Sequence, residues 1–265
     1  MRHKPIKSLG QNFLVDQNIR RKIITALDLK PADIVFEIGA GRGELTGLIA
    51  PKVDRLFALE IDRRLYSLLI DRLEIHSNLT LINRDILKCD LNKILEENKI
   101  ESEVKVFGNI PYYISSPIIE LLINQRGVVK EVFITVQKEF AKRVVALPGS
   151  KEYGSFSCFV QYYAIPEILF QINRGCFHPV PKVDSCFLRL RFRKEPAVSV
   201  KNEELLFKVI RAAFNQRRKT LKNTLKGKVQ SEKLEEFFLK NNLNPNIRAE
   251  ELSLAEFADL VNSLN

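Results

Sequence analysis

A short apolar run that leads directly into a glycine-rich turn constrains the fold of this chain more than any other feature. Residues 34–38 read IVFEI, and residues 39–43 read GAGRG. The run is too short for a typical helix and is bounded by Asp33 and Gly39, so it predicts a buried strand. Glycines let the chain turn tightly and let the backbone approach a ligand closely. The pattern therefore predicts a strand, a ligand-binding turn and then a helix.

An acidic residue follows at a spacing typical of nucleoside-binding sites. Glu60 ends a second apolar run, residues 56–59, and stands 21 residues after Gly39. A carboxylate at about this spacing can accept hydrogen bonds from both hydroxyls of a ribose. By themselves these features fit a dinucleotide site equally well.

Two details favour a cationic ligand over a dinucleotide. The turn reads G-x-G-x-G through Gly39 and Gly41, whereas the pyrophosphate fingerprint is G-x-G-x-x-G. Glu37 stands at the end of the strand, where its carboxylate would repel a pyrophosphate held at the helix N-terminus. S-adenosylmethionine carries an ammonium and a sulfonium and no phosphate, so it fits better. The alternative is a tight turn that binds nothing, and the presence of both Glu37 and Glu60 argues against it.

A third apolar run, residues 79–82, ends shortly before Asp85. An aspartate after a strand is usually a turn or helix cap. This one is the third acidic side chain in register along successive strand ends, where open α/β sheets bind ligands. We therefore expect Asp85 to accept a hydrogen bond from an adenine amino group.

The segment that follows the fourth predicted strand, residues 104–107, carries groups suited to a weakly nucleophilic amine. Residues 109–113 read NIPYY. The lone pair on N6 of adenine is delocalised, but an amide oxygen of Asn109 and a nearby backbone carbonyl can accept both N6 protons and favour a pyramidal nitrogen. Pro111 restricts the backbone that holds these acceptors, and Tyr112 can stack on the base. The alternative is an ordinary Asn–Pro turn, which is a poor explanation at a strand end downstream of a cofactor loop.

Four motifs of the chain resemble those of the ribosomal RNA adenine dimethyltransferases. They are residues 11–14 (QNFL), 37–43 (EIGAGRG), 109–112 (NIPY) and 177–185 (FHPVPKVDS). They occur in the family's order and spacing, and the resemblance covers nearly the whole chain. It is strongest to the bacterial small-subunit enzymes, which dimethylate two adjacent adenosines near the 3′ end of 16S rRNA.

The resemblance implies roles for individual residues. Six would line the S-adenosylmethionine site: Asn12, Leu14, Gly39, Glu60, Asp85 and Asn109. Tyr112 and Phe177 would sandwich the target adenine, with Asn109 and Pro111 forming the rest of the catalytic loop. The product of the cofactor would be S-adenosyl-L-homocysteine.

Composition agrees with an RNA partner and an intracellular setting. The 265 residues carry a formal net charge of +10, which fits a polyanionic partner. The four cysteines form no C-x-x-C pair, so we expect reduced thiols in a cytoplasmic protein. The three histidines are isolated, so no metal site is expected. We also expect no secretion signal, no membrane span and a monomer.

The order of predicted elements indicates an α/β fold, a Rossmann-like S-adenosylmethionine-dependent methyltransferase sheet with a small all-helical C-terminal domain. Strands and helices alternate up to about residue 145, with Asp16 capping the first helix. Ser115 or Ser116, with Pro117, is expected to start another helix directly after the NIPYY loop. Further strands are expected at 132–136, 159–163, 168–172 and 186–192. The polar stretch 193–196 marks the expected boundary. The domains are therefore 1–194, with an N-terminal basic segment 1–15 that can contact RNA or cover the cofactor, and 195–265 for RNA docking.

The C-terminal part carries most of the charge imbalance. Residues 205–230 contain eight Lys or Arg and no Asp or Glu. If this stretch is helical, with a break near Asn215, one face carries Leu206, Ile210, Phe214, Leu221 and Leu225, and another carries Arg211, Arg218, Lys222 and Lys226. Such a run is usually only a solvated face, but its single sign predicts binding to RNA phosphates. The expected contacts are Arg211, Arg217, Arg218, Lys219, Lys222 and Lys226.

Three other functions stay open at the level of sequence. A large-subunit 23S rRNA adenine dimethyltransferase conferring macrolide resistance has the same chemistry, although residues 215–221 (NQRRKTL) resemble the small-subunit enzymes more. A paralogue with the same fold could bind RNA or DNA without catalysis. A DNA adenine methyltransferase fits less well, given the rRNA-type motif around Phe177.

Overall fold

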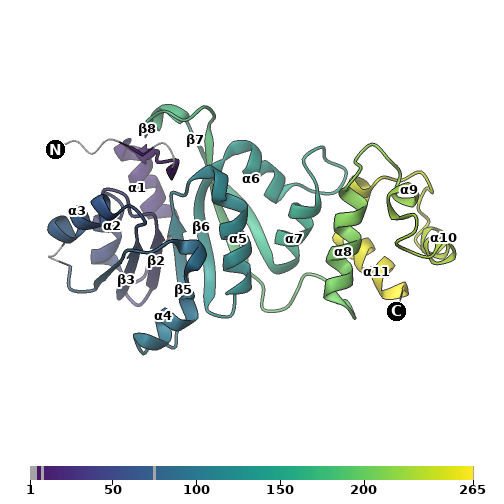
Figure 1. Cartoon of the computed structure of the whole chain (residues 1–265), viewed down its shortest axis with the longest axis horizontal. Helices are drawn as coiled ribbons and strands as arrows, with labels where there is room; N and C mark the ends of the chain where they lie inside the picture. The colour runs from purple at the N-terminus through teal and green to yellow at the C-terminus, as the bar shows by residue number, and fades with distance from the viewer. Residues whose placement is uncertain (1–4, 7–8, 74–75, 265) are drawn as a thin grey trace. The chain divides into compact units, whose positions relative to one another are not determined.

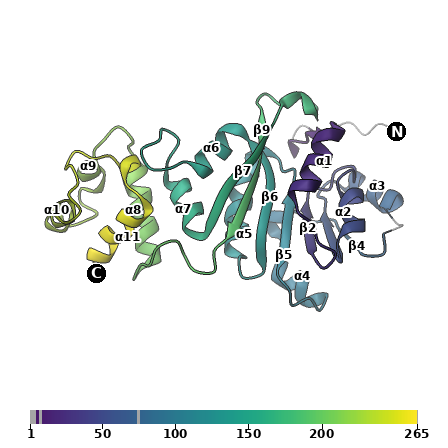
Figure 2. The same ribbon diagram turned by 180° about the vertical axis from the view of Figure 1, so that it is seen from behind.

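The computed structural model describes residues 5–6, 9–73 and 76–264 of the chain (Figures 1 and 2). Residues 1–4 and 7–8 of the basic N-terminal segment lie outside the described residues. Contacts divide the chain into two compact units. The first comprises Met1–Ala141 and Glu167–Phe192, and the second comprises Lys142–Pro166 and Arg193–Asn265.

The first unit is built on a seven-stranded sheet with the order β4-β3-β2-β5-β6-β9-β7. Its first five strands are parallel, and β9 runs antiparallel to β6. A separate two-stranded ladder joins β1 (Phe13–Leu14) to β8 (Phe177–His178). The sheet strands are β2 (Ile34–Ile38), β3 (Arg55–Leu59), β4 (Leu79–Ile82), β5 (Val104–Gly108), β6 (Val129–Gln137), β7 (Ala164–Ile172) and β9 (Ser185–Phe192). This is the Rossmann-like α/β arrangement that the sequence predicts.

Helices cover both faces of this sheet, and the central strands β2 and β5 are therefore buried along their whole length. Figures 1 and 2 view opposite faces and show α5 (Ser115–Asn124) in front of one and α1 (Gln17–Ala26) in front of the other. Ile23 of α1 belongs to a core that includes Phe107, Phe133 and Phe187 from β5, β6 and β9. The remaining α-helices here are α2 (Thr46–Ile49), α3 (Arg63–Leu73), α4 (Leu91–Glu97) and α6 (Lys138–Val145), which runs into the second unit.

The local signals that predicted the helix ends are confirmed. Asp16 caps α1, its side chain accepting a hydrogen bond from the backbone N–H of Ile19 at 2.9 Å. Helix α5 starts at Ser115, directly after the NIPYY segment. The two tyrosines of that segment and Ile114 form a single-turn 3₁₀ helix, η4 (Tyr112–Ile114), directly before α5.

The strand predicted at 159–163 is wrong, because these residues form the end of helix α7 (Ser155–Tyr163). The Ser157 hydroxyl accepts a hydrogen bond from the Gly154 N–H, which helps to start the helix. Phe159 and Tyr163 then meet one turn apart with ring centroids 5.5 Å from each other. Aromatic residues favour strands in isolation, but here the i,i+4 contact and packing on Phe207 favour the helix.

The rest of the second unit is helical, as predicted for the C-terminal part. Its helices are α8 (Glu203–Phe214), α9 (Leu221–Leu225), α10 (Ser231–Lys240) and α11 (Leu254–Ser263). The predicted break is confirmed, since Asn215 is the C-cap of α8. Leu206, Ile210, Leu221 and Leu225 are all buried in this unit. No helix among the described residues is long and apolar enough to cross a membrane.

Candidate active site

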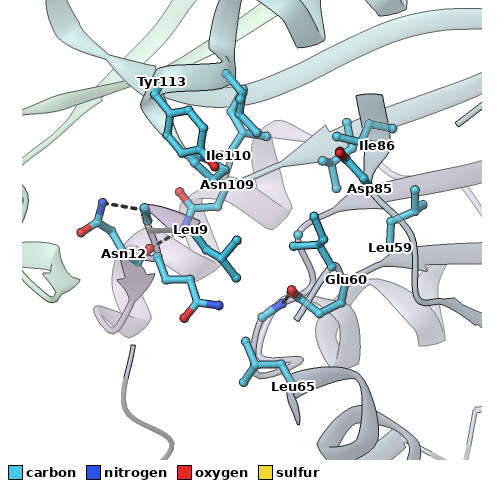
Figure 3. A pocket seen from close by; sticks show the side chains of 18 of the residues that line it. Leu9, Asn12, Leu59, Glu60, Leu65, Asp85, Ile86, Asn109, Ile110 and Tyr113 are labelled. Carbon is cyan, nitrogen blue, oxygen red and sulfur yellow. Dashed lines mark hydrogen bonds between the residues drawn. The ribbon is translucent and has the colours of Figure 1, made fainter. Parts of the chain in front are cut away.

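The first unit holds a cavity of about 260 Å³ beside the ends of the parallel strands and the loops that follow them (Figure 3). The turn after β2, the end of β3, the segment after β4 and the NIPYY loop after β5 all contribute to its walls. Of the residues predicted for the site, the cavity is lined by Asn12, Gly39, Gly41, Glu60, Asp85, Asn109, Pro111 and Tyr112. Parallel strands explain this convergence, because their carboxyl ends meet at one edge of the sheet.

The glycine-rich turn is held against the end of β3 by a buried carboxylate. Gly39 and Gly41 have φ of +75° and +61°, conformations that residues with a Cβ rarely adopt. This geometry allows the Gly41 N–H to donate to Oε2 of Glu60 at 2.8 Å, while the Asp62 N–H donates to Oε1 at 2.9 Å. Burial raises the pKa of Glu60. Each carboxylate oxygen keeps a further lone pair for a ribose hydroxyl.

Asp85 caps a short helix and also lines the cavity. Its Oδ1 accepts a hydrogen bond from the Leu87 N–H at 3.0 Å and so caps the 3₁₀ helix Ile86–Lys88. Its side chain also lines the cavity. The cap orients the carboxylate, and its other oxygen is available to an amino group.

Glu37 and Leu14 line a second cavity, of about 40 Å³, which shares Gly39, Gly41 and Asn109 with the first. Glu37 is 2 % exposed, and its Oε2 has no hydrogen-bond partner among the described residues. Burial raises the pKa of this carboxyl group to about 8. An unpartnered buried carboxylate is costly unless a donor or a cation meets it. The position therefore fits an ammonium group.

The segment 9–14 crosses the cavity and fixes the orientation of Asn109. The Asn109 side chain donates from Nδ2 to the backbone carbonyl of Asn12 at 3.0 Å. Because a carbonyl can only accept, this bond assigns the amide nitrogen and leaves Oδ1 as the atom that can accept. Gln11 ties the same segment to the end of β3 by donating from Nε2 to Oδ2 of Asp62 at 3.1 Å. Hydrogen bonding from the Arg64 guanidinium lowers the pKa of Asp62 to about 2, so this anchor is ionised.

Tyr112 lines the cavity and is anchored at its phenol end. Its hydroxyl forms a 2.6 Å hydrogen bond with the hydroxyl of Ser185, the fully buried first residue of β9. Phe177, in contrast, lines neither cavity. It pairs with Leu14 in the β1–β8 ladder, and its ring is 2 % exposed within the core of the first unit.

We expect Ser185→Ala to lower the free energy of unfolding by about 1 kcal/mol, because it leaves the Tyr112 hydroxyl without its partner. Tyr112→Phe is the matched variant, since it removes the other half of the same bond. Chemical denaturation of the two single variants and the double variant checks this. Fully additive losses would contradict a direct bond between the two hydroxyls.

Gln11, Asp62 and Ser185 contribute to the site without having been singled out in the sequence. Gln11 and Ser185 are the first and last residues of the QNFL and FHPVPKVDS motifs, so both stood within recognised segments. Nothing in the sequence marked Asp62 as part of the site except its position two residues after Glu60. Their roles depend on contacts between segments far apart in sequence, which spacing does not reveal.

The predicted RNA-contacting cations belong to the second unit, and all are exposed: Arg211, Arg217, Arg218, Lys219, Lys222 and Lys226. Two of them have partners inside this unit. The Arg217 guanidinium donates to the backbone carbonyl of Lys151, and Lys222 forms a 2.9 Å ion pair with Glu235. The described residues contain no group of His, Cys, Asp or Glu suited to a metal ion, and all four cysteines are free thiols.

Comparisons with known proteins identify the family of this chain. The family model for ribosomal RNA adenine dimethylase matches residues 2–265. The chain is 44 % identical over 262 residues to a protein of Caldanaerobacter subterraneus subsp. tengcongensis named ribosomal RNA small subunit methyltransferase A, covering 98 % of this chain and 97 % of that one. A protein of the same name from Alkaliphilus oremlandii is 42 % identical, covering 97 % and 91 %.

Two solved structures share the fold over nearly the whole chain. A dimethyladenosine transferase from Plasmodium falciparum is 27 % identical with a TM-score of 0.76, covering 94 % of this chain and 95 % of that one. The 23S rRNA methyltransferase ErmE is 24 % identical, also with a TM-score of 0.76, covering 96 % and 99 %. With its family model matched from residue 2 to residue 265, this chain belongs to the ribosomal RNA adenine dimethylase family.

Proposed function

We propose that this protein transfers methyl groups from S-adenosylmethionine to N6 of two adjacent adenosines near the 3′ end of 16S rRNA, giving N6,N6-dimethyladenosine during ribosome biogenesis. The observation that carries this proposal is the orientation of Asn109. Its Nδ2 is engaged by the Asn12 carbonyl, so its Oδ1 is the acceptor next to the two adjoining cavities, the larger lined by Glu60 and Asp85 and the smaller by Glu37. The methyl donor is S-adenosylmethionine, which supplies an electrophilic methyl group on sulfur.

The residues of the two cavities match the parts of this cofactor. Glu37, with its unpartnered buried oxygen, would meet the ammonium, and Glu60 would accept the ribose hydroxyls. Asp85 would accept from the adenine amino group. Asn12, Leu14, Gly39 and Gly41 line the same space and would hold the cofactor by shape and backbone contacts.

The NIPYY loop would act on the target adenine. Oδ1 of Asn109 would accept a hydrogen bond from one N6–H and a backbone carbonyl near Pro111 from the other. This would localise the nitrogen lone pair for attack on the methyl group, with S-adenosyl-L-homocysteine as the leaving group. The methylated nitrogen carries positive charge and loses its proton readily, so no strong base is needed. Tyr112 stacks on one face of the base. Phe177 would contact the other face, and this requires the β1–β8 ladder to open, since the ring is buried.

The second unit would dock the RNA through phosphate contacts, which position the substrate without reading its sequence. We expect a variant with Arg218, Lys219 and Lys226 all changed to glutamine to bind rRNA more weakly, with the largest loss at low salt. The slope of log affinity against log salt should fall by about 0.7–0.9 for each lost contact. Arg217 and Lys222 are left intact here because Arg217 holds Lys151 and Lys222 pairs with Glu235. An unchanged slope would place the docking surface elsewhere.

The small subunit is the proposed substrate because the curated relatives quoted above carry that name. We further propose that the protein acts as a monomer in the cytoplasm, where ribosomal subunits are assembled. Offering it radiolabelled S-adenosylmethionine with unmethylated small or large ribosomal subunits tests the substrate. Labelled N6,N6-dimethyladenosine at adjacent small-subunit positions is expected. Label only on large-subunit RNA would favour the 23S activity, and cofactor binding without transfer would favour a non-catalytic paralogue.

A further inference from the structure

The tyrosine that follows Tyr112 has a different environment and no assigned role. Tyr113 lines the larger cavity, yet its side chain is 64 % exposed. Its hydroxyl has no hydrogen-bond partner among the described residues, unlike that of Tyr112. Figure 3 shows the ring above Asn109 and Asn12, at the rim of the cavity. The loop thus presents an aromatic surface that the reaction at the target base does not use.

One edge of this exposed ring lies against the backbone of Gly10. A Cβ at position 10 would lie 3.1 Å from Cε1 of Tyr113 and 3.2 Å from Cβ of Pro111, so only glycine lets the segment 9–14 pass this close. Gly10 also has a φ of +60°. On the other side, the Ile114 N–H donates to the Pro111 carbonyl at 3.2 Å and closes the turn that carries the tyrosine. A ring that lies against a neighbouring backbone segment, on a closed turn, loses less conformational entropy when a ligand stacks on it than a free side chain does.

We propose that Tyr113 forms a second nucleobase subsite, which stacks on the nucleotide next to the target adenosine in the RNA. This inference rests on the function proposed above. Turning one base out of a strand exposes the face of its neighbour and costs a few kcal/mol. A fixed aromatic surface beside the entrance replaces that lost stacking, and every base offers a face for it. The ring is neutral and lies at the cavity rim, which suits a base rather than a phosphate.

The experiment measures kcat, KM for unmethylated small ribosomal subunits and Kd for S-adenosylmethionine in a series at position 113 of the full chain. Tyr113→Phe keeps an aromatic face, Tyr113→Leu keeps apolar bulk and Tyr113→Ala keeps neither. We expect Phe to match the wild type, whereas Leu and Ala raise KM by about 5- to 150-fold, the range for losing one stacked base. The salt slope of RNA binding should not change, because the ring carries no charge. The Kd for the cofactor should not change either, because the ring is proposed to stack on the RNA and not on the cofactor.

The matched control is Ile70→Ala, which removes an exposed apolar side chain from α3 outside the cavity and should leave KM unchanged. Equal KM values for Phe, Leu and Ala would overturn the stacking subsite, whether they equal the wild-type value or are raised together. A parallel loss of cofactor affinity in the Ala variant would also overturn it, because it would show a structural role for the ring. If the wild-type protein itself transfers no methyl group to small subunits, the proposed function fails instead.

Discussion

Asn109→Ala should lower kcat for methyl transfer by about 100- to 1000-fold, the usual cost of removing one preorganised hydrogen-bonding group from a transition state. The change removes Oδ1, the acceptor proposed for an N6 proton, and also the Nδ2 bond to the Asn12 carbonyl. The Kd for S-adenosylmethionine should stay within about threefold, since the acidic groups proposed to bind the cofactor remain. Single-turnover transfer to small ribosomal subunits and calorimetric cofactor binding measure the two effects separately.

Two further variants separate the parts of this effect. Asn12→Ala deletes a neighbouring amide but keeps the backbone carbonyl that orients Asn109, so it should cost much less in kcat. Asn109→Asp keeps an oxygen acceptor but has no N–H for that carbonyl, so it should lose part of the rate and loosen the segment 9–14. Turnover of Asn109→Ala equal to that of the wild type would rule out the assigned role.

Affinity for S-adenosylmethionine should rise as the pH increases from 6 to 8, and Glu37 should account for the rise. Burial raises the pKa of Glu37 to about 8 in the folded protein, from an ordinary value of 4.5. An ammonium that binds beside the group favours its ionised form, so binding below pH 8 must release a proton. Linkage sets the upper limit at about tenfold in affinity per pH unit. Calorimetry in two buffers of different ionisation enthalpy would count the released proton.

Glu37 should also make the free energy of unfolding depend on pH when no cofactor is bound. Between pH 4.5 and about 8 the folded protein holds a proton on Glu37 that the unfolded chain has lost. The stabilising contribution of this group is therefore complete below pH 4.5 and is lost as the pH rises through about 8. Glu37→Gln should remove this decline in unfolding free energy, as well as the pH dependence of cofactor affinity that the carboxyl group contributes.

Glu44→Gln is the matched control, because it removes a carboxylate from the same cavity. Glu44 lies 3.6 Å from the Arg20 guanidinium in an ion pair, and its side chain is 26 % exposed. Burial is the main cause of the raised pKa of Glu37 and the charge of Glu44 a minor one, so Glu44→Gln should keep the pH dependence. Titration of the cofactor's own amino group affects all variants equally and cancels in the comparison. Identical pH profiles for the wild type and Glu37→Gln would show that Glu37 does not meet the ammonium.

The agreement between sequence and structure was closest where local chemistry decides the outcome. A capping aspartate, a Ser–Pro helix start and short apolar runs ending in acidic residues each act within a few positions, and Asp16, Ser115 and the strand before Glu60 lie where they were expected. The error at 159–163 arose where local preference and packing disagree. The aromatic residues there favour a strand by themselves, but Phe159 meets Tyr163 across one helical turn.

The sequence by itself determined that this chain is an α/β protein of the rRNA adenine dimethylase family. The turn glycines, the acidic residues at the strand ends and the NIPYY loop are each recognisable within a short stretch of sequence. Only the tertiary structure decided how these pieces are oriented. The Asn12 carbonyl sets the amide of Asn109 from 97 positions away, and Ser185 anchors Tyr112 across 73 positions. It also decided that Phe177 is buried and that Tyr113 is exposed. Spacing along a chain records which residues are near in sequence, whereas burial and hydrogen-bond partners depend on segments that meet only on folding.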